Sequence, residues 1–222
     1  MGIITRSAAN NITTGGVILP AGINDASVAS VTALAQVSAG DGITLISSQT
    51  ASSSASLSFT TGIDSTYRTY MFKFINMHPS TNAHFSFNLS TDSGSNYNVT
   101  KTSTVFGAYH NESGTDTLLS YDTGRDLAQS TGYQKITMGG QVGANDADRS
   151  FSGTLILFNP SNTTYVKHYI SNSNFMDEQP TPYTVNAFVG GYANTTSAIN
   201  AIDFIYSAGN IDAGTIHMYG IN

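Results

Sequence analysis

The chain has 222 residues, a net charge of -6 and only 10% charged residues, against roughly 25% in ordinary soluble domains. Its acidic balance offers no basic surface to neutralise phosphates, so we predict no nucleic-acid partner. The absence of cysteine excludes disulfides and cysteine-ligated zinc, and the absence of a run of about 18 apolar residues predicts no membrane association through a spanning helix.

The first 41 residues carry only short apolar patches, separated by Asn, Gly and Pro20. Val28, Val31 and Leu34 recur at a spacing of three, which is compatible with a short helix over residues 25–36, while a leading strand and turn of the main fold is the preferred interpretation. A third interpretation is an arm that docks on a neighbouring subunit, because a partner surface can bury apolar side chains too sparse to bury one another. The residues expected to make that contact are Ile18, Leu19, Val28, Val31 and Leu34.

From residue 42 onwards, segments rich in β-branched and aromatic residues alternate with turns rich in Gly, Asn and Asp. They predict strands near 57–62, 67–77, 83–90, 103–110, 133–140, 153–160, 164–171, 184–192, 198–206 and 214–221. Helical periodicity is scarce, so we expect less than about one tenth helix. The sequence therefore predicts an all-β fold, an antiparallel β-sandwich or jelly roll over residues 42–222, preceded by an extended N-terminal arm over residues 1–41.

Catalytic side chains do not occur in any familiar arrangement. The five histidines form no HExxH pair, no serine lies in a GxSxG elbow, and no phosphate-binding glycine motif is present. Asp177 and Glu178 are adjacent carboxylates before Pro180 and Pro182, and we interpret them as solvated loop charges rather than glycosidase acids. We predict that the protein is not an enzyme, has no catalytic residue and needs no cofactor.

Two oxygen-rich loops offer potential calcium ligands. One is the loop 92–96, and the other contains Asn145, Asp146 and Asp148. Neither loop has the bidentate glutamate that closes an EF-hand site, and local Asx turns explain both without a metal. We therefore predict no metal site.

Three stretches carry a resemblance to a known group of proteins: TGIDSTYRTYMFKFINMHPSTNAHFSFNLSTDSGSNYNVTKT at 61–102, AYHNESGTDTLLSYDTGRDLAQSTGYQ at 108–134, and the closing SAGNIDAGTIHMYGI at 207–221. In this order they resemble small virion structural proteins and tail-fibre tip domains of tailed bacteriophages, especially phages of marine bacteria. The resemblance covers about residues 44–222. It implies a virion structural protein that is made in the host cytoplasm and carried on the particle surface.

The resemblance leaves two roles open, and the first is preferred. As a capsid decoration or cement protein, the chain would contact the major capsid protein and form a symmetric homo-oligomer, for which a trimer is one option. As a tail-fibre or receptor-binding tip, it would join tail proteins and bind host surface glycans. The side chains expected to face a glycan in that role are Tyr97, Tyr109, His110, Tyr121 and Tyr133. A host-derived carbohydrate-binding module is a third class.

Overall fold

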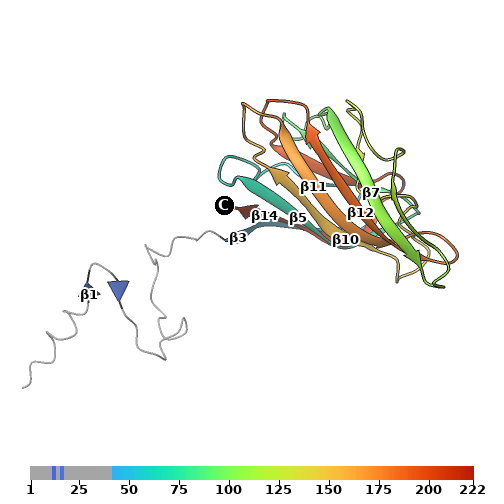
Figure 1. Cartoon of the computed structure of the whole chain (residues 1–222). Coiled ribbons are helices and arrows are strands. Elements are labelled where there is room, and N and C mark those ends of the chain that lie inside the picture. Colours follow the sequence, from blue (N-terminus) through green and yellow to red (C-terminus); the bar gives the residue numbers. More distant parts are fainter. Residues whose placement is uncertain (1–11, 14–15, 18–41) are drawn as a thin grey trace, which may run out of the picture. The chain divides into compact units, whose positions relative to one another are not determined.

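The computed structural model describes residues 12–13, 16–17 and 42–222 (Figure 1). The two short pairs form an antiparallel ladder of β1 (Ile12–Thr13) and β2 (Gly16–Val17). The five predicted docking residues and the alternative helix over 25–36 lie outside the described residues. Residues 42–222 are built from strands and turns, and the described part of the chain contains no helix that could cross a bilayer.

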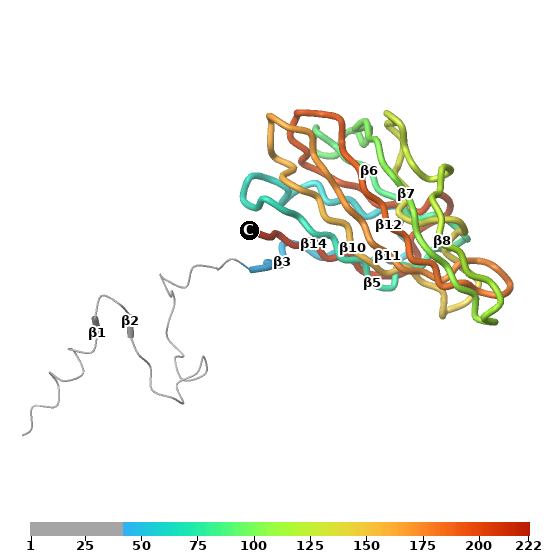
Figure 2. Tube along the Cα trace, viewed as in Figure 1, coloured from blue at the N-terminus to red at the C-terminus, as the bar shows by residue number. Residues whose placement is uncertain are grey.

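The predicted antiparallel β-sandwich is confirmed. The larger sheet contains β3 (Ile43–Thr50), β5 (Thr69–Pro79), β7 (Lys101–Asn111), β8 (Thr117–Tyr121), β10 (Phe151–Phe158), β11 (Lys167–Met176), β12 (Tyr183–Ala193) and β14 (Ile211–Ile221). The smaller sheet contains β4 (Leu57–Phe59), β6 (Phe85–Ser90), β9 (Gln134–Lys135) and β13 (Ala201–Tyr206). Their orders are β3-β14-β5-β10-β11-β12-β7-β8 and β4-β13-β6-β9, and Figure 2 shows β3 and β8 at opposite sides of the domain.

Most predicted strands match the structure, but β3 and β8 were not predicted, and residues 133–140 form only the two-residue β9. β3 and β8 are the edges of the larger sheet, where each strand needs to pack on one neighbour only, so their sequences alternate weakly. Ile136 and Met138 are buried as strand residues would be. The chain there stays beside β6, through the Ile136 N–H to the Phe85 carbonyl and the bridge between Val142 and Ala83, but Gly139 has a positive φ of 64° and interrupts a regular strand.

The core lies between the sheets and is built mainly from phenylalanine rings. Phe74 of β5 packs against Phe204 of β13 with ring centroids 5.2 Å apart, and Phe85 of β6 packs against Phe151 of β10 at 4.9 Å. All four rings are buried. Edge-to-face and tilted aromatic pairs of this kind add to the free energy gained by burying their area, so this cluster holds the two sheets together.

The connection between β8 and β10, residues 122–150, covers inner surface of the larger sheet. Ser173 of β11 donates its hydroxyl to the Ile136 carbonyl at 2.7 Å, and Tyr169 donates to Gln134 Oε1 at 3.3 Å. A Cβ on Gly107 of β7 would lie 2.8 Å from Met138 Sδ, so the absence of a side chain at this glycine is what admits the methionine. This connection therefore completes the core where the larger sheet is wider than the smaller one.

His84 gives the fold a pH dependence on the acid side. It is buried before β6, with Nδ1 2.9 Å from Thr137 Oγ1, and burial, aided by the positive Arg125 and Lys135, lowers its pKa from 6.5 to about 4. The unfolded chain binds this proton at a higher pH than the folded chain, so stability is complete above pH 6.5 and falls as the pH drops towards 4. We expect His84 to contribute up to about 3 kcal/mol of this loss.

Urea denaturation between pH 7 and pH 4 tests this expectation. His84→Gln keeps a polar side chain that can bond Thr137 but does not titrate, so its free energy of unfolding should fall less steeply over this range. Parallel pH profiles for the two proteins would assign the acid sensitivity to other groups.

Candidate functional site

The larger sheet has one face on the core, while its opposite face, which points away from the smaller sheet, carries a continuous row of large apolar side chains. Cross-strand register places these residues side by side on five neighbouring strands: Leu45, Tyr219, Met71, Ile156 and Ile170. Because residues of one strand alternate between faces, all five point away from the core. We call this set the apolar row.

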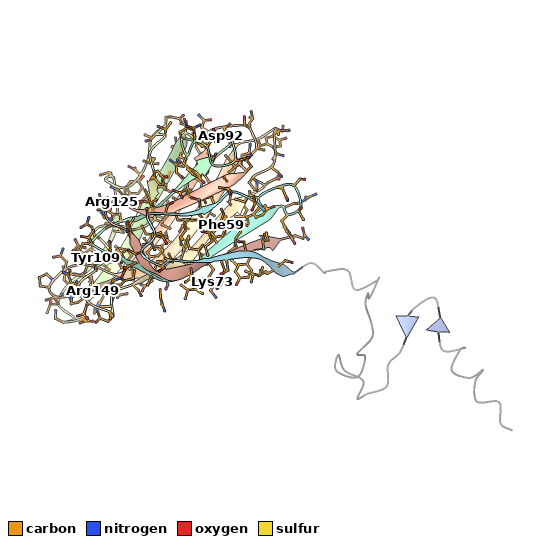
Figure 3. The ribbon with its side chains drawn as sticks, turned by 180° about the vertical axis from the view of Figure 1, so that it is seen from behind. Phe59, Lys73, Asp92, Tyr109, Arg125 and Arg149 are labelled. Carbon is orange, nitrogen blue, oxygen red and sulfur yellow. The ribbon has the colours of Figure 1, made fainter. Side chains whose placement is uncertain are left out.

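Two parallel rows flank it. Ile43, Ile221, Thr69 and Phe158 lie on one side. On the other side lie Ser48, His217, Lys73, Thr154, Asn172, Phe188, Phe106 and Tyr121. The apolar row and these two flanking rows make up what we call the outer face. Lys73, labelled in Figure 3, is the one lysine, arginine or acidic residue among them.

The outer face is accessible within the described part of the chain. Ile43 is 60% exposed and Ile170 is 52% exposed, and the rings of Phe106 and Phe188 stack at 5.3 Å, with Phe106 exposed at its edge. Contiguous exposed apolar surface of this kind marks interaction sites, because leaving it in water costs free energy. No motif in the sequence indicates this surface, because each residue of the apolar row comes from a different strand.

The two edge strands of the larger sheet are also open to partners. β3 (ITLISSQT) and β8 (TLLSY) each hydrogen-bond to a single described neighbour, and neither contains a charged residue. Leu119 on β8 is 75% exposed. Edges that must avoid association usually carry lysine, proline or a protective bulge. β3 has one such irregularity, because Ile46 has no partner on β14, whereas the β7–β8 ladder is regular, so β8 above all offers free backbone groups beside an apolar face. The arrangement suits binding to another protein.

The structure separates the predicted glycan-facing residues into two groups. Tyr133 donates its hydroxyl to Asp203 Oδ2 at 2.8 Å, on the side of the smaller sheet that faces away from the core, and Tyr97 belongs to the same region. Tyr109, His110 and Tyr121 lie on β7 and β8. The five side chains therefore do not form one binding surface.

Tyr109 does line a pocket, together with Asp177 and with residues that the sequence did not single out. Its ring meets that of Tyr183 edge to face at 5.0 Å. The pocket has a volume of about 200 Å³ and is lined by Tyr109, Met138, Gly139, Gly140, Asp177, Gln179, Tyr183 and Val185. An aromatic pair beside a carboxylate and an amide offers both an apolar platform and hydrogen-bonding groups, as small-ligand sites do.

The interpretation of Asp177 as a solvated loop charge was wrong. Asp177 is buried, and its Oδ1 accepts the backbone N–H of Tyr183 at 3.0 Å and that of Gln179 at 3.3 Å. Glu178, beside it, accepts the N–H of Gln141. The two carboxylates therefore hold the turn between β11 and β12 against residues 139–141, because backbone N–H groups in a tight turn need acceptors.

The two oxygen-rich loops differ in their internal bonding. In the loop with Asn145, Asp146 and Asp148, the Arg149 N–H donates to the Asp146 backbone carbonyl at 3.2 Å, and no hydrogen bond from a described residue goes to the three side chains, so the Asx-turn interpretation of this loop was wrong. Asp92 Oδ1 accepts the Ser90 hydroxyl at 2.6 Å and the Asn96 N–H at 2.8 Å, so the Asx-turn interpretation of this loop is confirmed. The hydrogen bond from Ser90, with those from Asn96, lowers the pKa of Asp92 to about 2. Figure 3 shows Asp92 well apart from Tyr109. Within residues 42–222, no three histidine or acidic side chains converge as metal ligands.

Comparisons with known proteins leave the geometry as the main guide to function. The chain matches no protein-family model, no curated protein and no solved structure.

Proposed function

We propose that this chain is a structural protein of a bacteriophage particle and that it decorates the capsid, binding other virion proteins through its outer face. The observation that carries the proposal is the apolar, almost uncharged outer face, bordered by two edge strands that contain no charged residue. A particle offers a large repeated surface, so one modest contact per subunit is multiplied by symmetry. The resemblance of residues 44–222 to small phage virion proteins supports the same role.

The strand order supports a finer interpretation of the fold as a jelly roll. If β3, β4, β5, β6, β9, β10, β13 and β14 are counted as strands one to eight, one sheet runs 1-8-3-6 and the other 2-7-4-5. This is the arrangement expected when two Greek keys are rolled into two sheets. β7–β8 and β11–β12 are then inserted pairs that widen the first sheet beyond β10. Jelly rolls occur in viral capsids and in lectins, which suits both roles considered.

The copy number on purified particles tests the proposal. A decoration protein should reach hundreds of copies per particle, so its band on a denaturing gel should be comparable with that of the major capsid protein. A few copies per particle, located at the tail, would support the receptor-binding alternative instead. Complete absence from purified particles would contradict both roles.

A charge placed in the apolar row should abolish docking without unfolding the domain. Ile170→Glu puts a carboxylate at a half-exposed position, where folding costs little. In a docked complex the same carboxylate would be buried without a partner, at a cost of about 3 kcal/mol, or roughly 100-fold in affinity. Ser113→Glu, in the exposed turn between β7 and β8, is the matched control.

Co-sedimentation with particles that lack the protein measures this effect. The control should bind like the wild-type protein, and both variants should keep the wild-type denaturation midpoint. Full binding by Ile170→Glu would remove the apolar row from the docking surface.

The Tyr109–Tyr183 pocket favours a second candidate, glycan binding by a tail tip. Sugar rings stack on aromatic faces, and Asp177 and Gln179 supply hydrogen-bonding groups at its rim. Binding of the purified domain to host polysaccharide, lost in Tyr109→Ala, would establish this role.

A further inference from the structure

Lys101, at the start of β7, is buried completely although no carboxylate within residues 42–222 accepts a hydrogen bond from it. Its Nζ donates to Asn88 Oδ1 at 2.5 Å and to the Val99 carbonyl at 2.8 Å. Lysine is almost never fully buried unless it is paired with an opposite charge, because desolvation of the ammonium group is costly. The site therefore favours the neutral amine, and burial lowers the pKa of Lys101 to about 7.

The carboxamide that faces this amine is fixed in a single orientation. Asn88 Nδ2 donates to the Tyr97 carbonyl at 2.6 Å and to the Thr131 carbonyl at 3.0 Å, and Oδ1 also accepts the Leu89 N–H at 2.9 Å. With both N–H groups held by carbonyls, Oδ1 must face Lys101. The Leu89 N–H polarises the carbonyl and can stabilise negative charge that develops on Oδ1.

The amine and the carboxamide carbon lie within reacting range. Nζ lies 2.5 Å from Oδ1, in direct contact with the carboxamide. Because the C=O bond measures about 1.23 Å, Nζ lies no more than about 3.7 Å from Cγ. Near-attack arrangements have reacting atoms about 3 to 3.5 Å apart, so a small movement of the lysine side chain suffices.

We propose that Lys101 and Asn88 form an intramolecular isopeptide bond. The lone pair of the neutral Lys101 amine attacks Asn88 Cγ, and a C–N bond forms. A proton moves from Nζ to Nδ2, the Cγ–Nδ2 bond breaks, and ammonia leaves. The product is a secondary amide between the two side chains, and the step consumes no oxidant, reductant or further reactant.

We assign the proton transfer between the two nitrogens to Asp203. It is the direct cross-strand partner of Asn88, from β13, and it is buried. Paired residues on one face of a sheet have Cβ atoms about 5 Å apart, which puts the Asp203 carboxyl beside the carboxamide. Ser58 and Tyr133 donate to its two oxygens and fix its position. Proton transfer by Asp203 then requires its carboxyl to reach the reacting nitrogens directly or through one water molecule, as general acid–base groups do.

The intact mass of the full chain tests the bond directly. We expect a mass about 17 Da below that of the sequence, because one ammonia is lost. Trypsin cannot cleave after an acylated lysine, so the digest should contain one peptide spanning 74–125 with the same deficit. The full sequence mass, with separate peptides 74–101 and 102–125, would overturn the proposal, and this result does not depend on any variant folding.

Three variants locate the chemistry. Lys101→Met should restore the mass expected from its sequence. Lys167→Met is the matched control, because Lys167 is also fully buried but its Nζ donates to the Thr195 carbonyl, and this variant should keep the deficit. Loss of the deficit in Lys167→Met but not in Lys101→Met would place the bond elsewhere. Asp203→Asn should accumulate without the bond, and bond formation at the wild-type rate would refute proton transfer by Asp203.

Discussion

Replacement of Phe204 by alanine should lower the free energy of unfolding by about 3 to 5 kcal/mol. Phe204 is fully buried in β13 at the centre of the core. Its ring packs against those of Phe59, Phe72, Phe74, Phe85 and Phe87, which come from strands of both sheets. Truncation removes the apolar area of one ring and leaves a cavity that five rigid neighbours cannot fill.

Chemical denaturation monitored by circular dichroism measures this loss. Phe158→Ala is the matched control, because Phe158 is 37% exposed on the outer face and its removal should cost far less. Equal losses for the two variants would mean that the core does not depend on the Phe204 cluster.

Deletion of residues 1–36 should leave the β-domain folded and soluble but abolish its incorporation into particles. We propose that Ile18, Leu19, Val28, Val31 and Leu34 dock on a neighbouring subunit. Burial of each side chain is worth about 1.5 to 3 kcal/mol before the cost of ordering the segment, so losing all five removes most of such a contact.

Particles assembled with the truncated protein provide the measurement. A shorter deletion of residues 1–11, which keeps all five side chains, should still be incorporated. Decoration at the normal copy number by the longer deletion would shift the contact onto the outer face alone. Failure of that truncated protein to fold would instead place the deleted segment in the core.

The alternation of inward and outward side chains along a strand could be predicted from the sequence wherever one face of the strand is exposed to solvent. In β11, buried and exposed residues alternate along nearly the whole strand, as the alternating sequence predicts, but the sequence does not indicate which face is buried, since Lys167 is buried and Ile170 is exposed. In β6 all six residues are buried, although Ser86, Asn88 and Ser90 are polar. The loops that follow β6 wrap over its outward side, and local sequence does not reveal which loop covers which strand.

Neither the apolar row nor the site around Asn88 could be predicted, because both depend on the register between strands that are distant in sequence. Met71, Ile156 and Ile170 each read as an isolated apolar residue until pairing places them side by side. Asn88 and Asp203 are 115 residues apart in the chain and become cross-strand neighbours only through the β6–β13 ladder. The alternation of strand and turn segments predicted the class of fold, whereas the order and register of the strands determine which side chains share a surface.

The position of β14 between β3 and β5 has a consequence for the folding pathway. Among the described strands β3 pairs with β14 alone, and Thr50 of β3 bonds Thr215 of β14 across 165 residues of sequence. Pairing across so long a loop is slow, because the entropy of loop closure is lost before the contacts are gained. Until β14 inserts, β5 exposes an unpaired edge and β3 has no place in the sheet, so the nascent domain is most prone to aggregate at this late step.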